Sequence, residues 1–515
     1  MDKSQDPSNP SLAAQRLAHD WETIRTIRKG ARAIREAGRR FLIPFPGEED
    51  SIVGDTGTFM NGRHETEYSR RLKSAPWRPE FNDCISTLAA KPFTKTVTLA
   101  EGANERMQGL AENIDGRGNN LHVFAKDVFE GGVSMGAHGI LVDYPSGQGA
   151  RTVAEERMLG VRPYWVPINA DDILELATEQ RGGRRVTTKL RIKESRVESV
   201  GFEQKLIPLI REIRADGGQG VSGSWKVWRK DTKTVNGKAE KEWVLDREGV
   251  MTLDEVPFVF YATNDIQGDQ YVQPPLINVA DMQIELYNAL SKKEQAYTIT
   301  ASPMLTANGM AAPPDNGKIQ TGPGRVLFAP GAEGINTSWD YIQPNAANLK
   351  EIREDIREII DDIRRLGMQP MTTAAGNTPS LAYAFDGEKS FTVLQSWALA
   401  LKDALEQAFV FTARWLNEPE ANAPSVEIHT DFTVGLYGNT EITELGKARY
   451  EGQISRETLW DEWKRRGVLS PSFDPEKEAK RLDAEAPKFD PADTMNAGDD
   501  AGDDDGQQDD EQDAA

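Results

Sequence analysis

Two long amphipathic segments that bracket a stretch rich in proline and glycine constrain the fold of this chain more than any other feature. The first, residues 275–299, begins with Pro275, which suits the first turn of a helix, and has a broad apolar face. The second, residues 348–366, places its leucines and isoleucines on one stripe and ends before Gly367, a typical helix stop. Residues 300–345 hold one predicted strand, in GRVLFAP. The pattern predicts two helices that flank a strand-bearing segment.

The rest of the chain is predicted to be α+β and mainly helical. Residues 162–263 alternate with a period of two and predict a strand-rich region, whereas the region before it has helical spacing, loosened at Gly30. Residues 368–389 lack hydrophobic periodicity and predict a loop, and residues 390–416 return to helical spacing. A helical segment capped by Ser455 is predicted near the end of the chain.

Charge is distributed unevenly along the chain. The net charge is −21, and residues 490–515 hold eleven acidic and no basic residues, which leaves −10 for residues 1–489. That tail has almost nothing to bury and is predicted to be disordered, either as a solubilising tail or as a docking peptide for a basic partner. The remaining acidity argues against tight non-specific DNA binding, although it is compatible with a protein that surrounds DNA without gripping it.

The sequence offers no recognisable catalytic motif, metal site or cofactor site. No phosphate-binding loop, zinc-peptidase helix or nucleophile elbow is present, and the run GVSMGAHG favours close helix packing over dinucleotide binding. The paired carboxylates 171–172 and 361–362 are expected to have structural surface roles. Cys84 is the single cysteine, so no internal disulfide forms. We therefore expect no enzymatic activity and no cofactor, although a site assembled from distant residues would escape such a search.

Several stretches resemble those of tailed-bacteriophage portal proteins, in the branch long known as a domain of unknown function. They are GARAIREAGRRFLIPFPGEED, YSRRLKSAPWRPEFNDCISTLAAKPFTKTVTL, RPYWVPINADDIL, PPLINVADMQIELYNALSKKEQA, the segment from GPGRVLFAPGAEG to IRRLGMQPM, and YEGQISRETLWDEWKRRGVLSPSFDPEKEAKRL. The likeness spans about residues 20–487 and involves structural motifs only. It implies the portal fold, in which wing, stem, clip and crown assemble as a ring.

The resemblance implies a division of the chain into segments. These are a disordered N-terminus (1–19), a wing that is helical and then strand-rich (20–273), a first stem helix (274–299), a clip (300–347), a second stem helix (348–367), a tunnel loop (368–389), a further wing part with a long helix and a strand (390–439), a crown (440–487) and a disordered acidic tail (488–515).

The resemblance also implies candidate functional residues. They are Gln369, Met371, Thr372, Thr373, Asn377 and Thr378 in the tunnel loop around DNA; Glu351, Asp355, Glu358, Asp362, Arg364 and Arg365 for contacts between stem helices of neighbouring subunits; and Pro313, Asp315, Lys318 and Arg325 on the partner-facing side of the clip. Reversing the charges of Arg364 and Arg365 is expected to weaken assembly of the ring.

A portal implies a head–tail connector at one capsid vertex, usually twelve-fold, through which DNA is packaged and later ejected. Its expected partners are further copies of itself, the terminase large subunit, a head–tail adaptor, the major capsid or scaffolding protein and double-stranded DNA in the channel. No membrane partner is expected, because no apolar run approaches the roughly 20 residues that a membrane helix needs. The expected location is the virion, after assembly in the host cytoplasm. The alternatives are another capsid-vertex or minor head protein, and a Mg²⁺-dependent nuclease with scattered carboxylates.

Overall fold

A computed structural model shows the chain as two compact units, Met1–Phe432 and Thr433–Ala515. The residues that the structure describes are 6–48, 66–145, 161–215, 223–235, 238–266, 270, 272–301, 304–308, 326–329, 338–342, 348–367, 380–430, 432, 439–465, 468–469 and 473–485.

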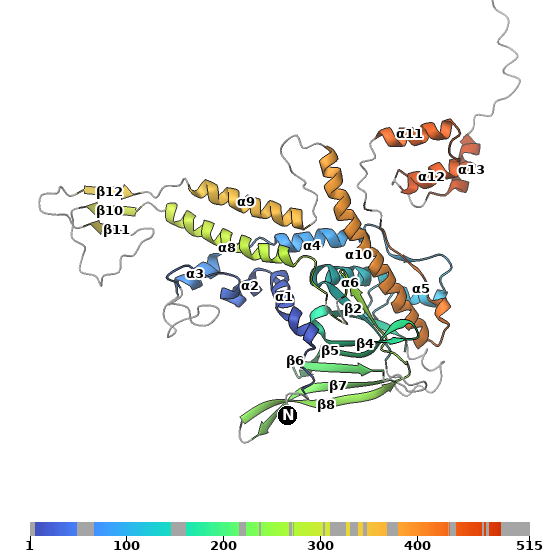
Figure 1. Ribbon diagram of the computed structural model, residues 1–515, viewed down its shortest axis with the longest axis horizontal. Helices are drawn as coiled ribbons and strands as arrows, with labels where there is room; N and C mark the ends of the chain where they lie inside the picture. Colours follow the sequence, from blue (N-terminus) through green and yellow to red (C-terminus); the bar gives the residue numbers. More distant parts are fainter. Residues whose placement is uncertain are drawn as a thin grey trace, which may run out of the picture. The chain divides into compact units, whose positions relative to one another are not determined.

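The first unit opens with helices that follow the amphipathic pattern of the sequence (Figure 1). Gly30, with a φ of 81°, separates the first two helices where a loosened helix was predicted. Ser11, Thr66 and Asn120 each cap a helix by accepting a hydrogen bond from a backbone N–H of its first turn. The helices are α1 (Leu12–Lys29), α2 (Ala31–Ala37), η2 (Gly38–Arg40), α3 (Glu67–Ser74), α4 (Glu80–Ala90), η4 (Lys91–Phe93), α5 (Glu105–Ala111) and α6 (Leu121–Met135).

The strand-rich region predicted over residues 162–263 is confirmed and forms parts of two antiparallel sheets. One sheet has the order β3-β2-β9 and the other the order β4-β5-β6-β7-β8, with a hairpin between β7 and β8. Their strands are β2 (Ala137–Asp143), β3 (Tyr164–Asn169), β4 (Ile173–Arg181), β5 (Arg184–Val200), β6 (Glu203–Arg214), β7 (Gly223–Val235), β8 (Lys238–Met251) and β9 (Phe258–Ala262), with η5 (Ala170–Asp172) before β4. A further strand pair, β1 (Thr98–Leu99) with β13 (Val426–Glu427), is only two residues long, so the strand expected within residues 390–439 is short.

The three-stranded sheet β3-β2-β9 lies between two apolar layers. Because side chains alternate along a strand, Trp165 of β3 faces the helices while Ile168 of the same strand faces the five-stranded sheet. The Trp165 ring meets Phe124 of α6 at 5.5 Å and Phe409 at 4.8 Å between centroids, in edge-to-face geometry. Both faces of this small sheet are therefore buried, and it joins the helical part of the unit to the larger sheet.

The run GVSMGAHG packs helix α6 closely onto β2 and β9, as the sequence predicted. A Cβ at Gly132 would lie 2.3 Å from Cε1 of Tyr261, a distance that real atoms do not adopt. Gly136 ends α6 in the left-handed conformation with a φ of 86°, and its N–H donates to the Gly132 carbonyl at 2.8 Å. Gly132 and Gly136 therefore allow α6 to pack closely against the neighbouring strands and to end where it does.

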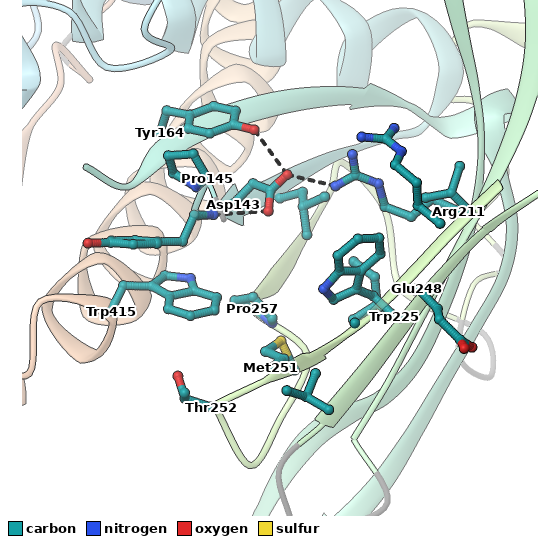
Figure 2. Close-up of a pocket in the computed structure, with 17 residues that line it drawn as sticks. Asp143, Pro145, Tyr164, Arg211, Trp225, Glu248, Met251, Thr252, Pro257 and Trp415 are labelled. Carbon is teal, nitrogen blue, oxygen red and sulfur yellow. Dashed lines mark hydrogen bonds and ion pairs between the residues drawn. The ribbon is translucent and has the colours of Figure 1, made fainter. Parts of the chain in front are cut away.

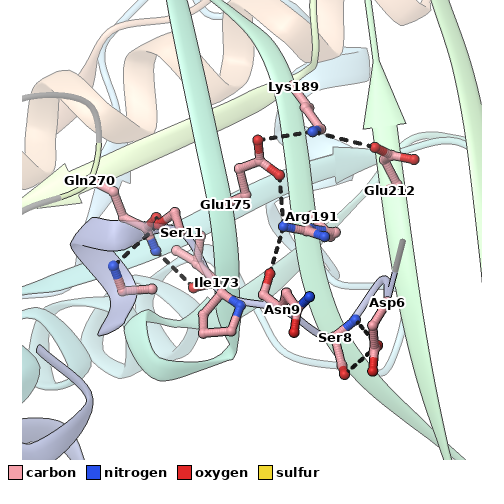
Figure 3. A network of polar contacts seen from close by, with 12 residues as sticks. Asp6, Ser8, Asn9, Ser11, Ile173, Glu175, Lys189, Arg191, Glu212 and Gln270 are labelled. Atoms are coloured by element: carbon pink, nitrogen blue, oxygen red, sulfur yellow. Dashed lines mark hydrogen bonds and ion pairs between the residues drawn. The ribbon is translucent and has the colours of Figure 1, made fainter. Parts of the chain in front are cut away.

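The beginning of the chain is bound to the five-stranded sheet, so the prediction of disorder over residues 1–19 is wrong for residues 6–19. Arg191 of β5 donates to the Asn9 carbonyl at 2.7 Å (Figure 3). The Ser11 N–H donates to the Leu174 carbonyl at 2.8 Å. Helix α1 then starts at once. The polar composition suggested a free tail because these partners lie far away in the sequence and cannot be read from it.

The two amphipathic segments form a pair of helices, α8 (Ile277–Thr300) and α9 (Asn348–Leu366), that lie side by side (Figure 1). The bounds of α9 match its predicted stripe. Between the helices the chain forms a sheet of order β11-β10-β12 rather than a single strand: β10 (Met304–Asn308) pairs in parallel with β11 (Val326–Ala329) and antiparallel with β12 (Ser338–Ile342). The β10 and β12 sequences are short and do not alternate clearly, which is why only the strand in GRVLFAP was predicted.

Helix α10 (Ser380–Trp415) begins ten residues before the predicted start, so residues 380–389 are helical and not part of a loop. A single interior glycine, Gly387, costs a helix only about 1 kcal/mol relative to alanine, which the flanking helix formers offset. The short helix η6 (Glu420–Asn422) follows.

The second unit contains the helices α11 (Asn439–Tyr450), α12 (Arg456–Arg465) and α13 (Pro475–Glu485). Ser455 caps α12 as predicted, because its Oγ accepts a hydrogen bond from the Thr458 N–H at 3.1 Å. The acidic tail lies outside the described residues.

Candidate functional site

The C-terminal half of α9 packs firmly against the body of the first unit. Ile356, Ile359, Ile360 and Ile363 form a buried stripe, and Ile363 has no exposed surface. This half of the helix contacts α4 and α8, and the close approach of Gly367 to Cys84 of α4 leaves no room for a side chain at position 367. Burial raises the pKa of the Cys84 thiol to about 12, so the group is protonated and inert at neutral pH. The apolar stripe predicted from the sequence is the face that fixes α9 in place.

Polar side chains fix the N-terminal half of α8. The Gln283 amide accepts from the Phe81 N–H at 2.9 Å and donates to the Arg78 carbonyl at 2.8 Å. Further along the helix, Asn288 donates to the Phe41 carbonyl at 2.8 Å. These side-chain amides hydrogen-bond to backbone groups of other elements and so fix the position of α8, because a shift of the helix would leave polar groups away from water without a partner.

A buried ion pair ties α8 to α3 and to the segment before it. The Arg71 guanidinium donates to the Glu48 carboxylate at 2.7 Å and to Ser291 Oγ of α8 at 3.1 Å, with both charged side chains under one-tenth exposed. The same guanidinium stacks on the Phe45 ring at 3.9 Å. The base of α8 is therefore anchored on two sides.

The other halves of the two helices are more exposed and carry most of their charge. Residues 292–298 of α8 and 348–355 of α9 contain no buried side chain among those described. They touch through Tyr297 and Arg353: the guanidinium lies 5.3 Å from the phenol ring centre and donates to its hydroxyl. The pair of helices thus has one end packed against the body and one end presented to solvent.

Most of the residues predicted to mediate subunit contacts lie on exposed faces of α9. Glu351, Asp355 and Glu358 are exposed, and Arg365 pairs within the helix with Asp362 at 2.7 Å. Arg364 differs, because it donates to Glu80 of α4 at 3.3 Å within the same chain. The predicted tunnel-loop residues 369–378 and the predicted clip residues 313–325 lie outside the described residues.

A basic groove lies beside α9 that the sequence did not reveal. Its volume is about 290 Å³, and its lining consists of Arg78, Lys293, Arg353, Ile356, Arg357 and Ile360. Arg353 and Arg357 share a face because they are four residues apart, and this spacing was visible in the sequence. Arg78 precedes α4 and Lys293 belongs to α8, so their place in the groove follows only from the packing of three helices.

A larger cavity of about 750 Å³ lies between the two sheets of the body (Figure 2). Asp143 accepts hydrogen bonds from Arg211 at 2.6 Å and from the Tyr164 hydroxyl at 3.1 Å, while Trp225 and Trp415 provide apolar walls. Burial next to the Asp143 carboxylate raises the pKa of Tyr164 to about 12. The charged groups at this wall engage one another, which is typical of a structural network rather than of groups poised for proton transfer.

The described residues contain no group of three or more metal-ligating side chains, and no described helix is long and apolar enough to cross a membrane. Of the paired carboxylates, Asp171 and Asp172 both pair with Arg25 of α1, the latter at 3.5 Å, which agrees with the predicted structural role. Asp362 pairs with Arg365 of its own helix at 2.7 Å.

The sequence family described as "Domain of unknown function (DUF4055)" matches residues 275–416, which run from just before α8 to the residue after α10. No curated protein matches the chain.

Chains in three solved structures of gene transfer agent (GTA) particles match this chain at low similarity. A chain of the neck of an empty GTA particle, computed with C6 symmetry, matches with a TM-score of 0.39 and 12% identity over 76% of this chain and 90% of that one. A chain of the native GTA virion matches with a TM-score of 0.36 and 14% identity over 78% and 89%. A chain of the native GTA neck, computed with C12 symmetry, matches with a TM-score of 0.37 and 12% identity over 74% and 88%.

Proposed function

We propose that this protein is a portal subunit: copies of it form a ring at one vertex of a phage capsid, and DNA passes through the central channel during packaging and ejection. The observation that carries the proposal is the helix pair α8 and α9. Each helix packs against the body over one half and is exposed over the other, and the sheet β11-β10-β12 connects their exposed ends. Such a pair of helices can form the wall of a channel, because each subunit of a ring would contribute two neighbouring helices to it.

The resemblance of the sequence to portal proteins supports the same assignment. The resembling stretches lie on α2 to α4, β3, α8, β11, β12, α9 and α12 to α13, so they include both the helix pair and part of the body that supports it. On this proposal α8 and α9 are stem helices, residues 300–347 form the clip, residues 368–379 narrow the bore, and residues 440–487, within the second unit, form the crown.

Charge supports a channel that does not hold DNA tightly. Each phosphate that a protein neutralises adds to DNA binding and its salt dependence, which would slow translocation. The net charge of −21, of which −10 lies in residues 1–489, opposes such binding. The proposed partners are other copies of the chain in a ring of about twelve by the resemblance, the terminase large subunit, a head–tail adaptor and the major capsid or scaffolding protein, with no catalytic activity of its own.

Electron microscopy of the purified full chain tests the proposal. Negative-stain images should show rings with a central hole, and light scattering after size exclusion should give a mass about twelve times that of one chain. Incubation with Mg²⁺ and linear duplex DNA should leave the DNA intact. A chain that stays monomeric at every salt and protein concentration, or that cleaves DNA with Mg²⁺, would refute the proposal; the second result would favour the nuclease alternative.

A further inference from the structure

Helix α9 carries opposite charges on its two flanks. At 3.6 residues per turn, each residue advances about 100° around the helix axis. Arg353, Arg357 and Arg364 then fall on one side of the buried isoleucine stripe, and we call them the basic flank. The acidic flank on the other side consists of Glu351, Asp355, Glu358 and Asp362.

Two residues of the basic flank, Arg353 and Arg357, line the basic groove. The positive charge of this groove is not balanced by carboxylates of the described residues. Four cationic side chains line it and no carboxylate does. Arg353 donates to a neutral phenol, and neither Arg78 nor Arg357 has an ion-pair partner among the described residues. The groove floor is apolar, because Ile356 and Ile360 lie at its base and are under one-tenth exposed.

The acidic flank holds a matching excess of negative charge. Glu351, Asp355 and Glu358 are exposed and have no ion-pair partner within the part of the chain that the structure describes. Successive members of the flank are three or four residues apart, so like charges lie next to one another and repel. This repulsion disfavours the isolated helix and is relieved by a cation-bearing surface.

The two flanks cannot neutralise each other within one chain. Their centres lie about 150° apart around the helix, so they face opposite sides. A second copy can satisfy both, because its acidic flank can enter the basic groove of the first copy while its own groove remains open to a third. Contacts of this head-to-tail kind use two different surfaces of each subunit, and they generate a closed ring when the rotation from one copy to the next closes.

We propose that the acidic flank of α9 in one copy docks in the basic groove of the next copy. This inference rests on the ring proposed above and names the surfaces that build it. DNA phosphates are the other ligand that a basic groove could attract. They are disfavoured because the groove has an isoleucine floor and because an acidic flank of comparable length already exists on the same helix.

Two charge-reversal variants of the full chain test the pairing. One is Asp355→Lys with Glu358→Lys, which removes the net negative charge of the acidic flank, and the other is Arg78→Glu with Arg357→Glu, which removes the net positive charge of the basic groove. Each variant alone should require at least about tenfold more protein than the wild type to form rings, because one side of every contact then has no net charge to attract the other. The matched control is Glu354→Lys with Asp361→Lys, which makes the same change on the solvent-facing side of α9 and should assemble like the wild type.

Mixing the two variants provides the decisive result. In an alternating ring, half of the contacts pair an unchanged acidic flank with an unchanged basic groove, and the other half place the introduced lysines opposite the introduced glutamates. Equimolar mixtures should therefore recover rings by negative stain and light scattering. Misfolded chains would not complement each other, which separates lost pairing from lost folding.

The outcomes distinguish this inference from the proposal on which it rests. Wild-type rings together with unimpaired rings of both variants would overturn the pairing and leave the portal assignment standing. Normal rings of the Arg78→Glu/Arg357→Glu variant with weakened binding of a labelled duplex, measured by anisotropy, would also overturn it and assign the groove to phosphate. A wild type that never forms rings would remove the portal proposal and the pairing together.

Discussion

Lowering the pH from 8 to 5 is expected to destabilise the first unit through one buried histidine. His138 of β2 is only 2% exposed, and its Nδ1–H donates to the Gly139 carbonyl at 3.0 Å. Its ring packs on Gly131 of α6, where a Cβ would lie 2.2 Å from the histidine Cδ2. Burial lowers the pKa of His138 from 6.5 to about 4, because the charged ring would lose its water.

The sign and size of the effect follow from the two pKa values. The unfolded chain takes up a proton on this histidine below about pH 6.5, whereas the folded chain does so only near pH 4. The unfolded state therefore binds more protons between these limits, so stability is complete above pH 6.5 and falls as the pH drops towards 4. The full difference corresponds to about 3 kcal/mol, of which about 2 kcal/mol is lost by pH 5.

The variant His138→Asn isolates this contribution. Its amide can donate to the Gly139 carbonyl as Nδ1 does but does not titrate, so the variant is weakened by a similar amount at both pH values. Urea unfolding of both proteins, followed by tryptophan fluorescence, should show the wild type losing about 2 kcal/mol more than the variant between pH 8 and pH 5.

Neighbouring groups titrate as well, but they are present in both proteins. Asp127 and Glu130 of α6 and Arg28 of α1 line the cavity next to His138. Burial raises the pKa of Asp127, which favours the folded state at low pH and opposes the histidine effect in wild type and variant alike. Equal pH dependence of the two proteins would refute the assignment of a buried, neutral His138.

Four substitutions, one of them combined with a rescue substitution, test the packing of the first unit. Ile363→Ala should lower the free energy of unfolding by about 2–5 kcal/mol, because the side chain has no exposed surface. Leu366→Ala, at a position that is 47% exposed, should lower it by no more than about 0.5 kcal/mol. The midpoints of urea unfolding compare the two variants. Gly132→Ala should destabilise by about 1–3 kcal/mol in thermal unfolding, since the new methyl meets a buried tyrosine ring. Arg71→Met should lower the free energy of unfolding by about 3–5 kcal/mol, because it leaves the buried Glu48 carboxylate without its cation. Adding Glu48→Gln removes that buried charge and should recover part of the lost stability. Equal losses in the first pair, or no loss in either of the others, would contradict the packing described.

The helices could be predicted from the sequence wherever an apolar stripe and a stop residue act together. The α9 stripe ends at Gly367, and the structure gives the predicted bounds because burial of the isoleucines and the glycine stop favour the same boundary. The break at Gly30 and the cap at Ser455 are also local signals and were predicted.

Features that depend on distant partners could not be predicted in this way. Residues 6–11 look like a free tail until Arg191 of β5 is placed beside them. The basic groove requires Arg78 and Lys293 to meet α9, and only the packing of α4, α8 and α9 brings them there. Periodicity describes which face of an element is buried, but not which side chains of other elements lie along its edges.

In the structure, a charge reversal at Arg364 and Arg365 would affect the fold of the subunit as well as its contacts with other copies. Arg364 is bound to Glu80 of α4, so a glutamate at position 364 would place like charges at the contact that holds α9 on the body, and weaker rings could then result from a displaced helix. Among the residues that the structure describes, the exposed half of α9 makes no ion pair with the body, and its Arg353 contacts Tyr297 of α8. Reversals at Asp355 and Arg357 therefore act on the assembly with less effect on the fold, which separates the two tasks of the helix: its C-terminal half fixes the subunit, and its flanks are available to the next copy.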